Sequence, residues 1–248
     1  MSVLLEVCTE RAEDSVAAVA AGAARIELNA ALALGGLTPS AGCMAATRSA
    51  VEVPIIAMLR PRAGPFAYSP SDFDVMRRDA DLLREHGADG FAFGCLTPQG
   101  HIDTDRCAAL MAQHPDAEWV FHRAFDVLPD LLDGLDVLIA LGVRRVLTSG
   151  GAPSAVDGTQ MLQRLIAHAA GRIEVLPGGG IQPHNVAALL RATGATQVHA
   201  SCSGVGVDPS GRHHPELNFR STSPLAAHQY KHVNTAQVAS LVRAAFSA

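Results

Sequence analysis

The sequence has few charged residues, few aromatic residues and no long uninterrupted apolar segment. Of its 248 residues, 17% are charged and 4% are aromatic, whereas 48% are hydrophobic. This composition is typical of a globular chain with a large core and argues against a disordered one. Because no apolar segment reaches the roughly 18 residues of a membrane-spanning helix, we expect no membrane span.

Positive charge and paired cysteines are also scarce. The net charge of -5 gives no electrostatic attraction for nucleic acid or for an anionic membrane surface. The five cysteines form an odd set without a C-x-x-C pair, which suits a reducing compartment. The first residues, MSVLLE, lack a basic segment followed by a long apolar one, so we expect a cytoplasmic protein.

The sequence instead contains a regular alternation of two kinds of segment. Helical periodicity is clear in segments such as Asp72–His86, Leu131–Leu141, Thr159–Ala170 and Asn185–Ala192. Short apolar segments between the helices predict eight strands: Leu4–Cys8, Arg25–Asn29, Pro54–Arg60, Gly90–Leu96, Trp119–Phe125, Arg145–Ser149, Arg172–Leu176 and Gln197–Ser201. Such alternation predicts an α/β fold with a parallel sheet, and eight units in about 250 residues fit a closed (β/α)8 TIM barrel. An open doubly wound sheet is the alternative.

Glycines mark the ends of four predicted helices. Gly22, Gly87, Gly142 and Gly194 each precede a short loop into the next strand, as a left-handed helix cap requires. No linker interrupts the pattern, so we expect a single domain over residues 1–248. The one irregular segment, residues 204–234, is predicted to be a long loop before a final helix near Thr235–Phe246, and such loops are usually functional or form contacts.

Polar residues gather at the predicted carboxyl ends of the strands, where TIM barrels hold their ligands. Residues two apart share one face of a strand, so Glu6 lies on the same face as Cys8, and Glu27 on the same face as Asn29. We therefore predict that acidic and basic side chains converge on one shared site. Its candidate catalytic residues are Glu6, Glu27, Arg60, His122, Arg123 and Asp126. Two simpler interpretations stay open: a buried Glu–Arg pair that only fixes packing, and a core histidine at position 122.

The motif PGGGI at 177–181 is a second signal. Consecutive glycines let backbone N–H groups converge on an anion, because no Cβ stands in the way. Since many barrels hold a phosphate after strands seven and eight, we predict an anion site there, with Arg60 or Arg123 as counter-charge. The candidate ligand-binding residues are Ser149, Gly150, Gly178, Gly179, Gly180, His199 and Ser201. A sharp turn without a ligand is the alternative.

Six ordered motifs resemble those of one known family. They are LLEVC at 4–8, RIELNAALALGGLTPS at 25–40, MLRPR at 58–62, FHRAFD at 121–126, VLTSGG at 146–151 and PGGGI at 177–181. Up to about residue 201 the chain resembles the CutC copper homeostasis family. The resemblance implies a TIM barrel, a cytoplasmic location, a homodimer or homotetramer, and copper binding with Cys8 as a metal ligand.

The chain departs from that family at several positions. The family often has a cysteine where this chain has Asn29, and the pair with Cys8 would suit Cu(I), which prefers thiolate and thioether ligands. Cys202 follows Ser201 where the family usually has Ala-Arg, so an arginine is missing but a thiol lies on the strand beside Cys8. The loop after Arg62 also lacks the family's acidic residue.

Two functions are therefore in competition. In the first, which the resemblance favours, the protein binds copper through Cys8, with Cys202 and Met58 as further ligands. In the second, it is a lyase, isomerase or hydrolase that acts on a small anionic or phosphorylated metabolite. Glu6 or Glu27 would then be the general acid or base, while arginines stabilise negative charge. No organic cofactor is implied, and we adopt the copper function.

Overall fold

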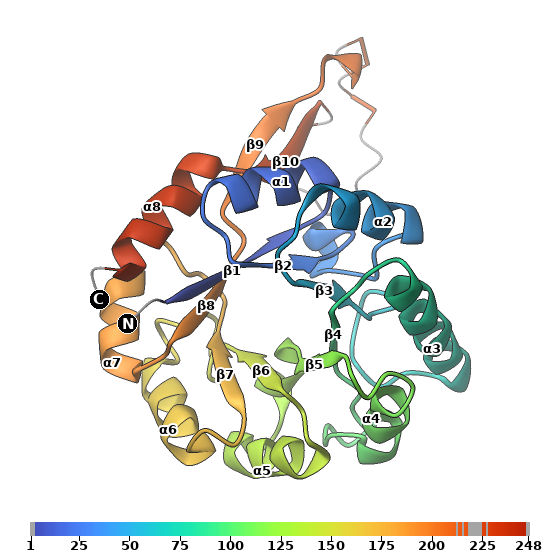
Figure 1. Cartoon of the computed structure of the whole chain (residues 1–248), viewed down its shortest axis with the longest axis vertical. Coiled ribbons are helices and arrows are strands. Elements are labelled where there is room, and N and C mark those ends of the chain that lie inside the picture. Colours follow the sequence, from blue (N-terminus) through green and yellow to red (C-terminus); the bar gives the residue numbers. More distant parts are fainter. Residues whose placement is uncertain (1–2, 212, 215, 218–224, 227, 247–248) are drawn as a thin grey trace.

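The computed structural model describes residues 3–211, 213–214, 216–217, 225–226 and 228–246, and its main feature is a barrel of parallel strands (Figure 1). The barrel strands are β1 (Leu4–Thr9), β2 (Arg25–Leu28), β3 (Ile55–Met58), β4 (Gly90–Phe93), β5 (Glu118–Phe121), β6 (Arg145–Thr148), β7 (Glu174–Pro177) and β8 (Gln197–Ala200). Around them lie α1 (Ala12–Ala20), α2 (Ala41–Ala50), α3 (Pro70–Glu85), α4 (Thr104–Met111), α5 (Leu131–Leu141), α6 (Thr159–Ala169), α7 (Val186–Thr193) and α8 (Thr235–Phe246). Short 3-10 turns are η1 (Leu32–Leu34), η2 (Arg123–Val127) and η3 (Pro209–Gly211).

The order of the strands confirms the TIM barrel. Neighbours follow the sequence from β1 to β7, and β8 pairs with β1 on its other side. A bridge between Gly178 and His199 joins β7 to β8 and closes the ring. A doubly wound sheet would reverse its strand order near the middle, so that alternative is wrong. Among the described helices, none has the length and apolarity needed to cross a membrane.

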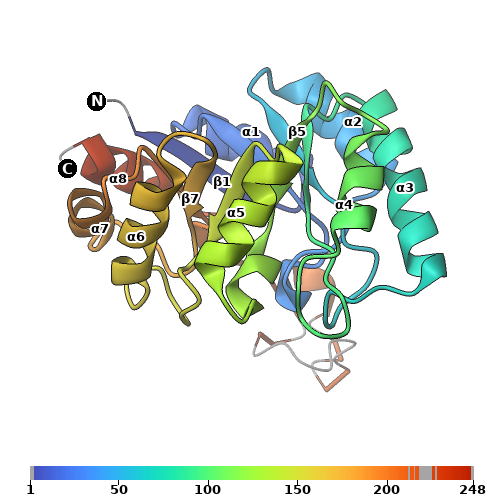
Figure 2. The same cartoon turned by 90° about the horizontal axis from the view of Figure 1, so that it is seen from below.

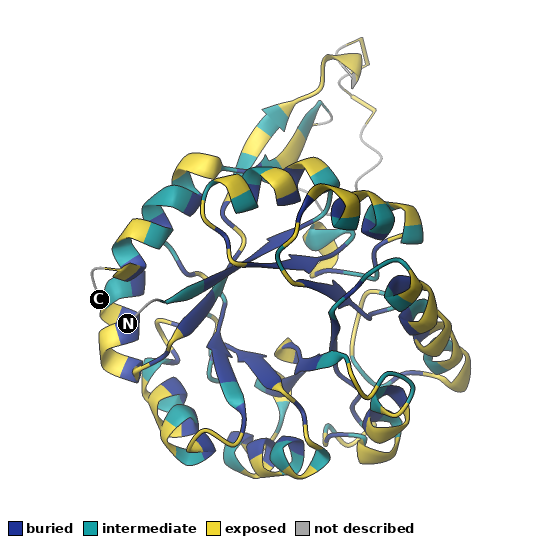
Figure 3. Ribbon diagram, in the orientation of Figure 1, coloured by how far each residue is buried: buried dark blue, intermediate teal, exposed yellow. Residues whose placement is uncertain are grey.

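Two apolar layers hold the barrel together. Outward-facing strand residues such as Val7, Ile26 and Phe93 pack with the inner faces of the helices in one large core. Figure 3 shows this arrangement, with buried strands at the centre and exposed outer helix faces. A smaller inner layer fills the barrel itself and consists of Ile56, Met58, Ala92, Val120, Leu147 and Leu176. The alternation of strand side chains separates these layers.

Below the inner apolar layer, polar residues from the first positions of several strands form a connected network. Arg25 bonds Glu6 and donates to Gln197 at 2.8 Å, while Gln197 donates to Glu174 at 3.1 Å. Arg145 donates to Glu174 at 2.8 Å and to Glu118 at 3.1 Å. We call these six residues the polar belt. The polar belt links β1, β2, β5, β6, β7 and β8 through hydrogen bonds to charged groups. A shift in strand register would break these bonds, so the belt helps to fix the register.

Local sequence explains where the elements end. The predicted caps are observed, because Gly142 and Gly194 end α5 and α7 in the left-handed region, at φ +79° and +72°. The fifth strand is shorter than the predicted Trp119–Phe125. It ends at Phe121 because the His122 ring accepts the Ala124 amide and starts the turn η2.

Part of the segment 204–234, expected to be a loop, differs from that expectation. It contains an antiparallel hairpin of β9 (Ser203–Val207) and β10 (Gln229–Val233), which projects beside α1 (Figure 1). Gly206 lies opposite Tyr230, and a Cβ at Gly206 would come within 2.7 Å of the tyrosine ring, so glycine there makes room for the pairing. Residues 212, 215, 218–224 and 227 of the expected loop lie outside the described residues.

The hairpin is tied to the barrel by a buried carboxylate. Asp14 of α1 accepts the Val233 amide at 2.9 Å and also pairs with Arg11. On the opposite side of the molecule, α3 to α6 stand along the outer wall (Figure 2). The chain therefore covers its barrel with helices and adds the hairpin at one part of the rim.

We predict that Gly90→Ala weakens the fold. A Cβ at Gly90 would lie 2.2 Å from the Glu118 carbonyl oxygen on β5, so two paired strands would have to separate. The free energy of unfolding should fall by about 1–3 kcal/mol, measured by urea denaturation. Gly42→Ala is the control, since its nearest atom, Ser40 Oγ, is 4.0 Å away. Equal stability of the two variants would contradict the expected clash.

Candidate functional site

The predicted site residues lie at the carboxyl ends of the strands in three groups. The first group is on β8, β1 and β2, where Glu6 pairs in register with His199, and Cys8 with Glu27. Ligand atoms of Glu6, Glu27 and His199 all lie within 4.8 Å of one another, which is close enough to share one metal ion. We call these three residues with Cys8 the Glu–His cluster.

An ion pair sets the charges in the Glu–His cluster. Burial alone would raise the pKa of Glu6, but the hydrogen bond from His199 and the Arg25 charge lower that pKa to about 2. Burial likewise disfavours the His199 imidazolium, yet the Glu27 charge and hydrogen bonds with Cys8 and Glu6 raise its pKa well above the usual value. Glu6 is therefore ionised, and His199 holds a proton against it over 2.7 Å.

Glu27 behaves differently from Glu6 although both carboxyl groups are buried. Burial raises the pKa of Glu27, and the charge of Glu6 adds to that rise. The His199 charge and the hydrogen bond that Asn29 Nδ2 donates at 2.9 Å lower the pKa of Glu27 only in part, so it stays raised. Two neighbouring carboxyl groups thus have opposite pKa shifts, an arrangement common at functional sites.

The structure assigns Glu6 a partner that the sequence analysis missed. Glu6 pairs with Arg25, not with Arg60, and Arg25 is the first residue of β2. The sequence contained a sign of this pairing, because Arg25, Glu27 and Asn29 are two residues apart and therefore lie on one face of the strand. The sequence also did not predict a role for Gln197, Glu174 and Arg145 of the polar belt, because they are the first residues of their strands and the site was expected at the carboxyl ends.

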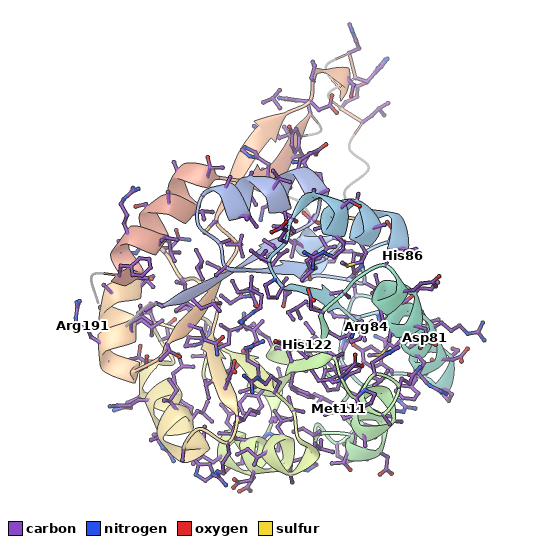
Figure 4. All side chains as sticks on the ribbon, viewed as in Figure 1. Asp81, Arg84, His86, Met111, His122 and Arg191 are labelled. Atoms are coloured by element: carbon purple, nitrogen blue, oxygen red, sulfur yellow. The ribbon has the colours of Figure 1, made fainter. Side chains whose placement is uncertain are left out.

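The second group consists of Arg60 after β3 and His122 after β5. The Arg60 Nη atoms donate to the carbonyl oxygens of Leu34, Gly36 and Gly64 at 2.9–3.0 Å. Burial and the Arg60 charge lower the pKa of His122 to about 3, so the imidazole is neutral at pH 7. Figure 4 shows His122 among the side chains inside the barrel, whereas Arg191 lies on the outer surface.

The third group is Arg123, Asp126 and the TSGG loop after β6. The Asp126 carboxylate accepts hydrogen bonds from the Ser149 and Gly151 amides and from the Thr148 and Ser149 hydroxyls. Arg123 donates to both Asp126 and Ser149 at 2.7 Å. The loop that includes Gly150 is therefore filled by the chain's own carboxylate. Its contacts make Asp126 an anchor for the loop, and a catalytic role for Asp126 or Arg123 stays a prediction.

The glycine-rich loop after β7 lies against the third group. Gly179 and Gly180 have φ of +99° and +72°, a region that side chains rarely adopt. A Cβ at Gly179 would come within 3.2 Å of Arg123 Nη1, so glycine lets the guanidinium approach the loop. Gly178 is bridged to His199, and Ser201 is exposed at the rim. An anion site at these glycines stays a prediction.

A cavity of about 220 Å³ lies between Cys8 of the Glu–His cluster and the hairpin. It is lined by Cys8, Thr9, Glu10, Asp14, Leu32, Ser201, Ser203, Lys231, His232 and Val233. Next to it, Cys202 is buried with φ of +43°, which is unusual for a residue with a side chain. Burial, with a smaller contribution from Cys8, raises the pKa of Cys202 to about 12, and a metal site shared by these two cysteines stays a prediction.

These observations define the class of protein: a TIM barrel whose mouth gathers a thiol, an imidazole and two carboxyl groups beside a cavity. A family model described as the CutC family matches residues 3–204. The copper homeostasis protein cutC homolog of Homo sapiens is 44% identical over 220 residues, which cover 89% of this chain and 78% of that protein. A CutC protein of Treponema denticola is 43% identical over 218 residues, 88% of this chain and 89% of that one.

A solved structure agrees with the sequence matches. The crystal structure of CutC from Streptococcus agalactiae has a TM-score of 0.76 and 32% identity, and the match covers 79% of this chain and 97% of that chain. The chain belongs to the CutC family, the copper homeostasis family that its motifs resemble.

We predict that Glu6→Gln destabilises the protein at pH 7 by about 3–5 kcal/mol, because Arg25 would keep a buried charge without a counter-ion. Since its folded pKa of about 2 lies below the usual value of 4.5, Glu6 contributes stability above pH 4.5 and loses it as the pH falls towards 2. Denaturation at several pH values should therefore show a shallower acid slope in the variant.

Glu13→Gln is the matched control for that measurement. The Glu13 side chain is 83% exposed and pairs only with Arg11, so its removal should change stability little. If Glu6→Gln were as stable as Glu13→Gln at pH 7, the buried ion pair would not support the barrel as described.

Proposed function

We propose that the protein takes part in copper homeostasis by binding Cu(I) at Cys8. The observation that carries the proposal is a thiol with three properties at once. Cys8 interacts with the His199 imidazole, lies on the wall of the 220 Å³ cavity, and shares that wall with Ser201 and Ser203, the residues on either side of Cys202. In this proposal copper is the ion that the protein handles, and the cavity gives the ion access to the Cys8 thiol.

The donor atoms fit a soft ion in its reduced state. Thiolate ligands select Cu(I), and imidazole also suits copper. A metal-binding histidine usually donates its other ring N–H to a carboxylate, and Glu6 already bonds His199 Nδ1 at 2.7 Å. The Glu6 carboxylate is held by Arg25 as well, so it would orient the imidazole while the sulfur atoms bind the ion.

Binding would release protons from this site. Because the pKa values of His199 and Cys202 are both raised, copper must displace protons that these groups hold at neutral pH. The affinity for Cu(I) would therefore increase with pH. Met58 belongs to the apolar layer inside the barrel, and its role as a thioether ligand stays a prediction.

The proposal includes the wider expectations drawn from the sequence. We propose a cytoplasmic protein of one domain over residues 1–248 that assembles as a homodimer or homotetramer, as the family resemblance implies. The alternative of an enzyme on a small anionic metabolite stays a prediction, because none of the relatives named above is described by a reaction.

We predict that Cu(I), titrated under reducing conditions, raises the melting temperature through Cys8. Ligand at 100 times its dissociation constant stabilises a protein by about 2.7 kcal/mol, which corresponds to about 5–10 °C for a chain of this size. Cys8→Ser should abolish the shift, since it removes the accessible thiol. The melting temperature is measured by calorimetry with and without the ion.

Cys107→Ser is the matched control for that titration. Cys107 is a buried cysteine that also has a thiol neighbour, Cys95, but it lies on α4, away from the cavity. Its variant should keep the copper shift. No shift in the unmodified protein, or a shift lost only in Cys107→Ser, would contradict the proposed site.

We also predict that Asn29→Cys binds Cu(I) more tightly than the unmodified protein. Position 29 follows β2 on the same face as Glu27, and Glu27 pairs in register with Cys8. A cysteine there would supply the second thiolate that the family often has. Competition with a Cu(I) chelator measures the affinity. Asn29→Ser is the control, because serine is close in size to cysteine but has no sulfur. Equal affinities for the two variants would contradict a site at Cys8.

A further inference from the structure

Four buried polar atoms have no hydrogen-bond partner among the described residues: Asn29 Oδ1, Arg60 Nε, Tyr68 OH and His122 Nε2. Three of them belong to residues that directly follow β2 or lie just after β3 and β5, at the barrel mouth. A buried polar group without a partner costs about 1–3 kcal/mol, and native proteins keep few of them. Several such atoms in one region point to a missing ligand.

Arg60 is held by three hydrogen bonds that use three of its five N–H groups, and Nε is its one nitrogen without any bond among the described residues. Its two Nη atoms bond the carbonyl oxygens of Leu34, Gly36 and Gly64, which lie on the loops after β2 and β3. These three bonds prevent the planar guanidinium from turning. The Nε–H group is therefore a fixed, cationic donor with nothing to donate to.

The tautomer of His122 is also determined by its contacts. The Ala124 amide donates to His122 Nδ1 at 3.2 Å, so in the neutral ring the proton is on Nε2. Gly94 is needed for this placement, because a Cβ there would come within 2.6 Å of two atoms of the imidazole. His122 thus presents a second fixed N–H donor, 3% exposed and without a partner.

One aromatic ring packs against both side chains. The Phe66 ring lies 5.1 Å from the His122 ring and 5.4 Å from the Arg60 guanidinium, measured between centres. Phe66 is only half-buried and belongs to the loop between β3 and α3. The Phe66 ring makes a cation–π contact with Arg60. It has no oxygen or nitrogen atom that could accept a hydrogen bond from Arg60 Nε–H or His122 Nε2–H. Phe66 therefore covers the donors without satisfying them.

Asn29 adds an acceptor near the same loops. Its Nδ2 donates to Glu27, which leaves the Oδ1 atom as an acceptor without a donor. That atom lies against Gly36, where a Cβ would be 2.4 Å from it, and the Gly36 carbonyl is bonded to Arg60. The apolar layer of Ile56, Met58 and Val120 lies below, on the preceding inward positions of the strands.

We propose that Arg60 and His122 bind the carboxylate of a small 2-hydroxy acid, with Asn29 Oδ1 accepting from its hydroxyl group and Phe66 moving aside to admit it. The set contains one cation and one neutral donor, which suits a monoanion better than a phosphate dianion. The site does not include Cys8 and does not depend on copper, although Asn29 lies between the two regions. It also gives a use to two buried residues that the copper site leaves unexplained.

The test is a titration of the full chain with lactate, followed by NMR of the imidazole ring nitrogens. Sodium chloride holds the ionic strength constant, and propionate serves as the acid without a hydroxyl group. We expect a saturable shift of the His122 Nε2 signal, with a dissociation constant on the order of 1 mM or tighter. Propionate should bind several-fold more weakly, because Asn29 would be left without its donor.

Two variants test the roles of the donor and of the covering ring. His122→Asn keeps an acceptor for the Ala124 amide but lacks the distant N–H group and the ring signal, so its binding is followed by titration calorimetry and should be about tenfold weaker for lactate. Phe66→Ala removes the ring that must move, so binding should tighten several-fold. Phe73→Ala is its matched control, because Phe73 makes a similar contact with Arg106, 5.2 Å away on the outer helices.

The outcomes are decisive in both directions. Saturable binding that weakens in His122→Asn, tightens in Phe66→Ala and is unchanged in Phe73→Ala supports the site. The proposal is overturned if lactate produces no saturable shift in either the unmodified protein or Phe66→Ala. It is equally overturned if propionate binds as tightly as lactate, or if His122→Asn binds both acids unchanged. Melting curves of each variant confirm that it is folded.

Discussion

The ion pair between Glu6 and Arg25 is the interaction on which the rest of the site depends. It joins β1 to β2 inside the barrel, and through Gln197 it connects to the polar belt that reaches β5. The same Glu6 carboxylate bonds His199 and so sets both the orientation and the charge of the imidazole beside Cys8. A carboxylate this deeply buried persists only because charged donors surround it.

Charge is distributed unevenly around the barrel mouth, and the three groups differ in how far they are satisfied. At β6, the Asp126 carboxylate accepts hydrogen bonds from the Ser149 and Gly151 amides of the TSGG loop, so these donors already have partners. At β8, β1 and β2, the raised pKa values of His199 and Cys202 keep both groups protonated at neutral pH. In the proposed function, Cu(I) displaces these protons. At β3 and β5, Arg60 and His122 keep donors without acceptors. We expect ligands to bind in the regions where buried polar groups lack hydrogen-bond partners.

Asn29 connects two of these regions, and its chemistry matters to both. The family often has a thiol at this position, whereas here an amide holds Glu27 through Nδ2 and leaves Oδ1 without a donor. An amide in place of the thiol that the family resemblance implies removes one soft ligand from the proposed copper site and adds one hard acceptor to the neighbouring region. Cys202, in its strained backbone conformation, is the further thiol ligand that the sequence analysis predicted.

The sequence by itself determined the class of fold, the helix caps and the rim of polar residues, because periodicity and glycine caps are local and strand ends share one edge of a barrel. Motif order also identified the family. Only the tertiary structure decided that Glu6 pairs with Arg25, that Asp126 fills its own loop, and that residues 203–207 and 229–233 form a hairpin. Partners chosen across strands depend on register and on side-chain reach, which no local pattern contains.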